Sequence, residues 1–162
     1  MALYFFDSSA LVKRYVRETG TDWVRAISDP TANNKIYVAE ITGVEVIAAI
    51  TRRVRTKSIS KTDAETAIKQ FRYDFAKQYK ISEIPSSIIS DAMDLTETYQ
   101  LRAYDAVQLS VALEIDSQIK AITKTTSIVS AVPSLTIVSA DDELNVAVIA
   151  EGLSLEDPKN YP

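Results

Sequence analysis

The chain of 162 residues contains neither cysteine nor histidine. Without cysteine it can form no disulfide framework and no cysteine-bound zinc site, and we expect a reducing compartment such as the cytoplasm. Without histidine it lacks the usual general base at neutral pH and the commonest ligand of transition metals. Carboxylates around a hard metal ion are therefore the chemistry that these side chains support best.

Long apolar runs are also missing. No run approaches the roughly 18 residues that a transmembrane helix needs, so we expect no contact with a membrane. Asp7 interrupts the first apolar run and no basic segment precedes it, which argues against a signal peptide. The hydrophobic content of 46% and the length suit a single domain over residues 1–162, with a surface tail at 157–162.

The charges are unevenly distributed, although the net charge is only −4. The segment 52–80 holds nine basic and three acidic residues, a net charge of +6, whereas the segment from Asp141 onward carries six acids and one lysine. A basic arm beside an acidic pocket is suited to holding a polyanion. The alternative is an ordinary solvated helical face.

Short apolar segments alternate with segments of helical periodicity along the chain. The predicted strands are 3–6, 36–38, 81–84 and 135–138, with a further short strand at 119–123 inside the ambiguous segment 115–134. The predicted helices are 8–17, 21–28, 40–57, the segment from a cap within 58–63 to 79, 86–99, 104–113 and 142–152. This alternation predicts an α/β fold, a three-layer α/β/α sandwich around a mainly parallel sheet of about four to five strands.

Two of the predicted strands end in a carboxylate just before a helix begins. Asp7 follows the run Leu3–Phe6, and Asp141 follows the run Leu135–Val138. Ligands of open α/β sheets bind outside the carboxyl ends of the strands, so we expect both acids at one site. Each also has a purely structural alternative, because Asp7 fits an N-cap and Ser139 fits a capping pattern before the last helix.

Two further acids lie at or within helices. Glu45 is the only charged side chain in the segment 41–50, whose apolar residues surround the helix, so we predict a buried helix. A buried carboxylate needs a partner, which is either a metal ion or Arg52, seven residues further on. Asp105 begins an apolar helix in which Gln108 imitates a capping box.

The four acids make best sense together. Four carboxylates that converge without a cation would repel one another and raise one another's pKa values. One or two Mg²⁺ or Mn²⁺ ions, bound through oxygen ligands, would remove this repulsion. We therefore predict one metal site formed by Asp7, Glu45, Asp105 and Asp141.

Four motifs, in order along the chain, carry a family resemblance. They run from Phe6-Asp7-Ser8-Ser9-Ala10 to Gly20, from Glu45-Val46 to Arg53, from Leu101 to Leu109, and from Val138-Ser139-Ala140-Asp141 to Leu153. With these motifs the chain resembles the PIN-domain ribonucleases, and within them the VapC-type toxins of type II toxin–antitoxin pairs. The resemblance covers nearly the whole chain.

The resemblance implies a PIN-like fold, Mg²⁺- or Mn²⁺-dependent cleavage of RNA, a cognate antitoxin and a homodimer. It gives metal-binding and catalytic roles to the same four acids, with Ser9 and Ser139 as polar supports of the pocket. The predicted contacts to the RNA backbone lie in the basic arm: Arg52, Arg53 and Arg55. One departure is Gln108, because many relatives carry histidine at this position.

Several alternatives stay open. A housekeeping PIN nuclease without an antitoxin and a non-catalytic α/β binding module would both have this pattern, and an upstream gene for a small DNA-binding protein would favour the toxin. A receiver domain or a haloacid-dehalogenase-like phosphatase fits less well, because serines follow Asp7 where those folds need a second acid. Phe71, Tyr73 and Tyr104 could stack on unpaired bases, although aromatic residues at helical spacing are more often core residues.

Overall fold

The computed structural model describes residues 1–125 and 133–162. Its strands are β1 (Leu3–Phe6), β2 (Lys35–Ala39), β3 (Lys80–Ser82), β4 (Leu135–Val138) and β5 (Ser154–Glu156). Its α-helices are α1 (Ser8–Leu11), α2 (Thr21–Ser28), α3 (Thr42–Arg55), α4 (Lys61–Lys77), α5 (Ser86–Tyr99), α6 (Ala103–Thr125) and α7 (Asp142–Ala150). Short 3-10 turns lie at Val12–Arg14 (η1), Pro30–Ala32 (η2) and Pro158–Asn160 (η3).

The five strands form one sheet in the order β3-β2-β1-β4-β5, and all four pairings are parallel. Alternate residues of β1 face opposite sides of this sheet. Leu3 and Phe5 pack in a core formed with α5, α6 and α7, whereas Phe6 packs in a second core formed with α1 to α4. Burial on both faces explains the continuous apolar runs of the strands and confirms the predicted three-layer fold.

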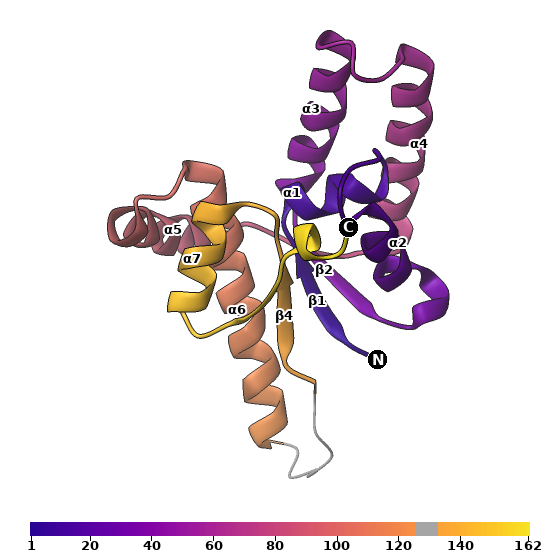
Figure 1. Ribbon diagram of the computed structural model, residues 1–162. Helices are drawn as coiled ribbons and strands as arrows, with labels where there is room; N and C mark the ends of the chain where they lie inside the picture. Colours follow the sequence, from indigo (N-terminus) through magenta and orange to yellow (C-terminus); the bar gives the residue numbers. More distant parts are fainter. Residues whose placement is uncertain (126–132) are drawn as a thin grey trace.

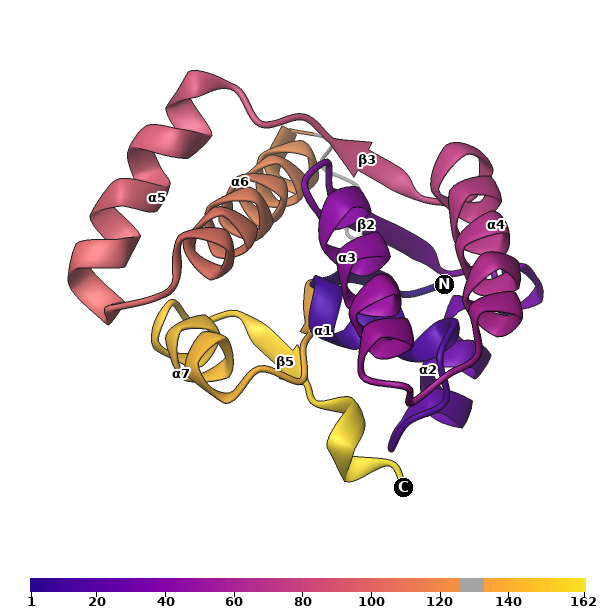
Figure 2. The same ribbon diagram turned by 90° about the horizontal axis from the view of Figure 1, so that it is seen from above.

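Helices α3 and α4 form a hairpin that stands above the carboxyl ends of the strands (Figure 1). Figure 2 looks down on this end of the sheet, with α3 and α4 on one side of the molecule and α5, α6 and α7 on the other. The hairpin carries the basic arm inferred from the sequence. None of the helices in the described ranges combines the length and the apolar character that a membrane span requires.

Two elements differ from the sequence prediction. The segment 119–123, predicted as a strand, belongs to the long helix α6, since no glycine or proline interrupts the helix and Ile115 and Ile119 continue its core-facing side. The edge strand β5 was not predicted, because three residues after a helix give too short a pattern to recognise. The serine- and threonine-rich loop predicted after residue 123 lies largely outside the described residues.

The first predicted helix is shorter than expected. It spans only Ser8–Leu11 and then tightens into η1 instead of continuing to Arg17. The chain next reaches Gly20, which caps α2 with a φ of +87°. The predicted stop at Gly152 is confirmed, because this residue has a φ of +74° and its N–H donates to Ile149 O at the end of α7.

The carboxyl-terminal residues, predicted as a surface tail, dock against α2. Pro158 is buried over Gly20, and the ring of Tyr161 stacks on Trp23 with 4.3 Å between the ring centroids. A Cβ atom added at Gly20 would lie 2.3 Å from the backbone oxygen of Pro158. Only glycine therefore permits this close approach of the two segments.

We expect Gly20→Ala to lower the free energy of unfolding by about 2–4 kcal/mol, because it combines a left-handed conformation with a clash against backbone. Gly152→Ala is the matched control, since Gly152 also has a left-handed φ but nothing lies within 4 Å of the added Cβ. This control substitution should lower the free energy of unfolding by about 1 kcal/mol. Urea unfolding of the two variants measures the difference, and equal losses would contradict the tight packing at Pro158.

Candidate metal centre

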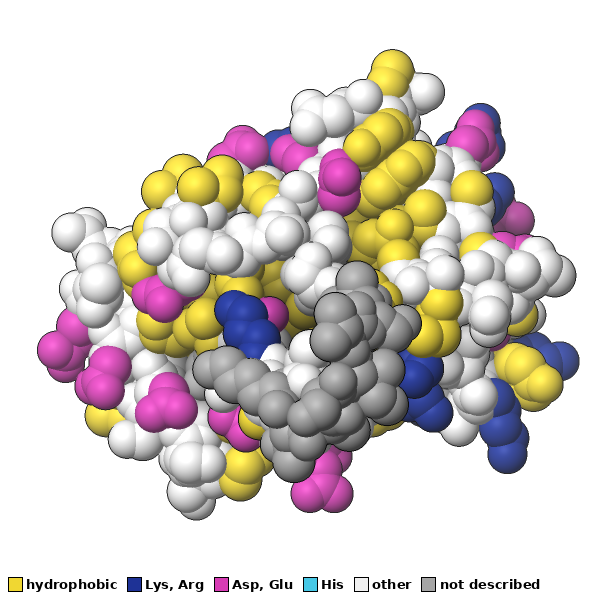
Figure 3. All heavy atoms as spheres, turned by 90° about the horizontal axis from the view of Figure 1, so that it is seen from below, with side chains coloured by type: hydrophobic (Ala, Val, Ile, Leu, Met, Phe, Trp, Pro, Cys, Tyr) yellow, Lys and Arg dark blue, Asp and Glu magenta, His cyan; other side chains and the backbone are white. Residues whose placement is uncertain are grey.

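The four predicted acids line one cavity of about 430 Å³ at the carboxyl edge of the sheet. Asp7 and Asp141 reach it from the ends of the adjacent strands β1 and β4, as the sequence predicted. Glu45 comes from the first turn of α3 and Asp105 from the first turn of α6. The opposite edge of the sheet has a different surface, on which acidic, basic and hydrophobic side chains are interspersed (Figure 3).

Asp7 is 2% exposed and also caps α1. Its Oδ1 accepts hydrogen bonds from the backbone N–H of Ala10 at 3.0 Å and from Ser9 Oγ at 2.8 Å. Burial nevertheless raises the pKa of Asp7 to about 7, because removal from water outweighs these bonds and the charge of Glu45 adds to it. Asp7 therefore caps α1, as the structural alternative predicted, and also lines the cavity.

Of the two predicted serines, Ser9 ties the ends of β1 and β4 together and Ser139 supports the loop that carries Asp141. Ser9 Oγ accepts a hydrogen bond from the N–H of Ala140 at 2.8 Å, so one hydroxyl links Asp7 to the loop that carries Asp141. Ser139 Oγ accepts from the N–H of Asp141 at 3.1 Å and is fully buried. The N-cap of α7 is Asp141 itself, whose Oδ1 accepts from two backbone N–H groups at 3.0 Å.

Glu45 does not lie on a helix that is buried all round, as its apolar sequence had suggested. The neighbouring Val44 is 66% exposed, because α4 covers only one side of α3. Glu45 accepts a 2.5 Å hydrogen bond from Gln108 Nε2 instead of pairing with Arg52. Burial raises its pKa, with a smaller contribution from the charge of Asp105.

Gln108 is the residue that orients Glu45. Its side chain is 1% exposed, and Nε2 donates both to Glu45 and to Thr42 Oγ1, the latter at 2.9 Å. It forms no capping box with Asp105, because α6 already begins at Ala103. Where the sequence only raised a question about this position, the structure assigns a role in positioning.

We expect Gln108→Leu to weaken Mn²⁺ binding about 10-fold, because loss of an outer hydrogen bond to a metal ligand usually costs this much. Gln118→Leu is the matched control, since Gln118 also donates to a carboxylate, Glu114, but on the exposed part of α6. Calorimetric titration of both variants with Mn²⁺ measures the effect. Equal affinities for the two variants would contradict the positioning role.

Asp105 has a buried carboxylate oxygen, Oδ2, that no hydrogen bond from the described residues satisfies. Burial raises its pKa to about 6, and the charge of Asp141 contributes to the shift. The donor set, four carboxylates with one orphaned oxygen, fits a hard divalent cation.

The acids are close neighbours but are not yet arranged around one point. Within residues 1–125 and 133–162, no group of three acidic side chains is already spaced to hold a metal ion. A divalent cation held by three or more of these carboxylates would require their side chains to move toward one another.

The three predicted arginines occupy different environments. Arg52 lines the cavity itself, and Arg55 lines an adjoining groove along α3. Arg53 instead pairs with Glu18, which also accepts a 2.8 Å bond from Lys13. Two polar residues that the sequence did not single out as ligand contacts also line the cavity, Ser8 and Arg102. Only their neighbours in the chain, Asp7 and Asp105, could have indicated them.

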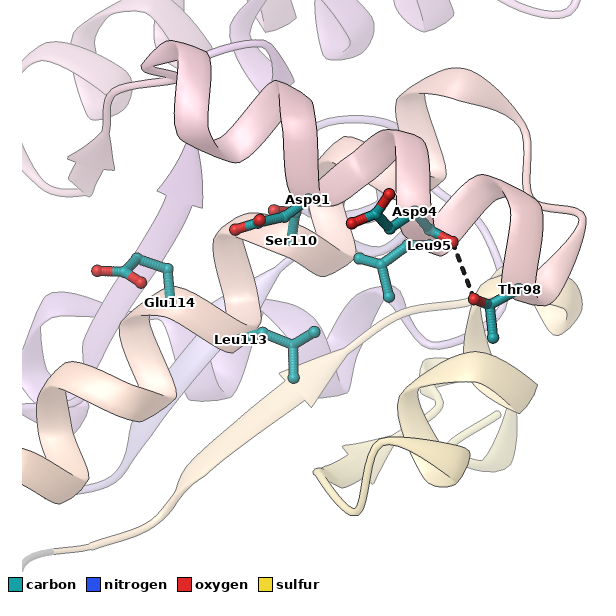
Figure 4. Close-up of a pocket in the computed structure, with 7 residues that line it drawn as sticks. All are labelled: Asp91, Asp94, Leu95, Thr98, Ser110, Leu113 and Glu114. Carbon is teal, nitrogen blue, oxygen red and sulfur yellow. Dashed lines mark hydrogen bonds between the residues drawn. The ribbon is translucent and has the colours of Figure 1, made fainter.

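A second hollow lies between α5 and α6, on a different part of the molecule (Figure 4). It is lined by Asp91, Asp94 and Glu114 together with polar and apolar residues of the same helices. Its hydroxyl groups donate to backbone carbonyls, since Ser110 of α6 donates to Ile88 O of α5 and Thr98 donates to Asp94 O within α5. It therefore lacks the orphaned buried oxygen that marks the first cavity.

Comparison of the chain with known protein families agrees with the fold and the carboxylate cavity. The PIN domain family model matches residues 4–145, and the chain belongs to this family. Ribonuclease VapC45 of Mycobacterium tuberculosis (strain CDC 1551 / Oshkosh) is 28% identical over 115 residues, which cover 71% of this chain and 78% of that protein. Ribonuclease VapC49 of strain ATCC 25618 / H37Rv matches with the same identity and coverage.

Two solved structures share the fold. PAE2754 from Pyrobaculum aerophilum superposes with a TM-score of 0.64 and 17% identity, covering 98% of this chain and 91% of that chain. VapBC2 from Rickettsia felis, solved with a DNA fragment from the promoter of its genes, gives a TM-score of 0.54 and 13% identity over 96% of this chain and 98% of that chain. At these identities the likeness concerns the fold alone.

Proposed function

We propose that this protein is a metal-dependent endoribonuclease and the toxin of a toxin–antitoxin pair. The observation that carries the proposal is the single cavity lined by Asp7, Glu45, Asp105 and Asp141, with a buried, unpartnered oxygen on Asp105. Membership of the PIN domain family and likeness to two proteins named ribonuclease VapC support the choice of RNA as substrate. We place its activity in the cytoplasm.

Asp7 and Asp105 are the first candidates to hold one Mg²⁺ or Mn²⁺ ion, because both are pushed toward neutrality in the absence of a cation. Glu45, held by Gln108, would bind directly or through water, and Asp141 would complete the site or help hold a second ion. The bound metal would supply a hydroxide nucleophile and polarise the phosphoryl oxygen. Arg52, at the rim of the same cavity, would hold the RNA backbone beside the scissile bond.

An antitoxin is the proposed protein partner. A groove of about 590 Å³ between α3 and α4 begins at Val44, which also lines the acidic cavity. Its floor includes Ile47, Phe71 and Phe75, so an apolar segment of a partner would fit there and could extend toward the acids. The homodimer implied by the family resemblance is part of the same proposal, and light scattering at several protein concentrations tests it.

The direct test is incubation of the purified protein with mixed-sequence single-stranded RNA in Mg²⁺, in Mn²⁺ and in EDTA. We expect cleavage with either metal and none with EDTA. The same incubations with structured tRNA and rRNA extend the search for a target. Absence of cleavage in every metal-containing reaction, by protein shown to bind the metal, would contradict the proposed function.

A further inference from the structure

Tyr104 is an exposed aromatic residue at the rim of the acidic cavity. Its side chain is 58% exposed, and it lines the same cavity as Asp105, its neighbour in the chain. Within the part of the chain that the structure describes, its ring stacks on no other ring and its hydroxyl has no hydrogen-bond partner. The residue thus contributes little to the core, and its ring is available to a ligand.

The three aromatic residues for which the sequence suggested base stacking differ in burial and in position. Phe71 is fully buried and belongs to the core between α3 and α4. Tyr73 is 64% exposed, but it lies on α4 and does not line the cavity. Only Tyr104 combines an exposed ring with a position beside the proposed metal ligands.

The side chains around Tyr104 are suited to contact both the phosphate and the base of a nucleotide. Arg52 and Arg102 line the same cavity, and guanidinium groups bind phosphate oxygens. An exposed tyrosine ring offers a flat surface on which a base can stack, and such stacking tolerates any base but requires the base to be out of a duplex. Phosphate and base contacts on one rim would fix a single nucleotide next to the acids.

We propose that Tyr104 stacks on the base adjacent to the scissile phosphate and thereby positions that nucleotide beside the acids. This inference rests on the proposed ribonuclease function and deepens it by naming a residue that positions the substrate. Tyr104 acts by contact with the substrate and not through the metal. Its ring, and not its hydroxyl, is the group that matters.

The test uses a single-stranded RNA oligonucleotide whose cleaved bond is first mapped with the parent protein. We expect Tyr104→Ala to lower kcat/KM by about 10-fold, in line with the loss of one base–aromatic stack. Tyr104→Phe should retain the parent activity because it keeps the ring. Tyr73→Ala is the matched control for loss of an exposed tyrosine and should leave cleavage unchanged.

Oligonucleotides with one abasic position beside the cleaved bond identify the stacked base. At that position the parent and Tyr104→Ala should cleave equally slowly, because the contact is already absent. Fluorescence anisotropy in an Asp7→Asn background should show the same pattern in RNA affinity without any turnover. The parent should also cleave the single strand far faster than the same sequence held in a duplex.

Normal cleavage by Tyr104→Ala, or equal cleavage of the duplex by the parent, would overturn the stacking role and leave the nuclease assignment intact. If Tyr104→Ala and the abasic change were simply additive, the ring would not contact that base and the proposal would fail likewise. If the metal-loaded parent neither bound nor cleaved any RNA, the proposed function and this inference would fall together.

Discussion

Asp7→Asn is expected to abolish RNA cleavage, by about 1,000-fold or more, while the fold survives. Loss of a charged metal ligand removes several kcal/mol of transition-state stabilisation, and each 1.4 kcal/mol corresponds to a factor of ten. The fold should survive because asparagine caps helices as well as aspartate does. Its side-chain oxygen can still accept from the N–H of Ala10 and from Ser9.

The control for this variant is Asp142→Asn. Asp142 is adjacent to a proposed ligand in sequence, but its side chain is 87% exposed and pairs with Lys159 on the surface. Circular dichroism and thermal unfolding establish that both variants are folded, and cleavage is then followed at fixed Mn²⁺ concentration. Parent-like cleavage by Asp7→Asn under these conditions would remove this carboxylate from the proposed site.

The second large effect concerns stability and pH. The metal-free parent is expected to be less stable than Asp7→Asn at pH 8, by on the order of a few kcal/mol. The folded state raises the pKa of Asp7 from 3.8 to about 7, so folding binds a proton between these values. Asp7 therefore does not reduce the free energy of unfolding below about pH 4. Its destabilising effect grows as the pH rises to about 7 and is constant above that.

The folded state also raises the pKa values of Asp105 and Glu45, so both groups add to the loss of stability at higher pH in the parent and in Asp7→Asn. The informative quantity is consequently the difference in melting temperature between the parent and Asp7→Asn, measured in EDTA from pH 5 to pH 8. This difference should grow with pH and then level off. A difference that stays constant over this range would contradict a strained carboxylate at Asp7.

Addition of Mn²⁺ at pH 8 should offset the lower stability of the parent relative to Asp7→Asn. Binding to the folded state alone stabilises by about 2.7 kcal/mol at a metal concentration of 100 times Kd. Asp7→Asn should gain much less, because it lacks one of the charged ligands, and EDTA should cancel the gain in the parent. Equal stabilisation of the two proteins would place the metal elsewhere.

Local sequence signals predicted the parts of the fold that depend on neighbours along the chain. The bounds of β1, β4 and α5 agree with the prediction, since apolar runs and turn residues mark them directly. The convergence of Asp7 and Asp141 followed from the same signals, because parallel strands bring their carboxyl ends to one edge. The metal and the RNA contacts stay predictions.

Features that depend on distant parts of the chain could not be predicted. The hydrogen bond from Gln108 to Glu45 joins residues 63 positions apart, and nothing near either residue indicates the other. The exposure of Val44 depends on how much of α3 its neighbours cover, which the composition of the helix does not determine. The packing of Pro158 on Gly20 likewise requires the two ends of the chain to meet.

The central position of β1 has a consequence for the time during which the chain is made. β1 is synthesised first, yet one of its two partners, β4, follows only at residues 135–138 and carries the fourth acid directly behind it. Because synthesis proceeds from the amino end, neither the central sheet nor the acidic cavity can be complete before residues 135–141 have been made.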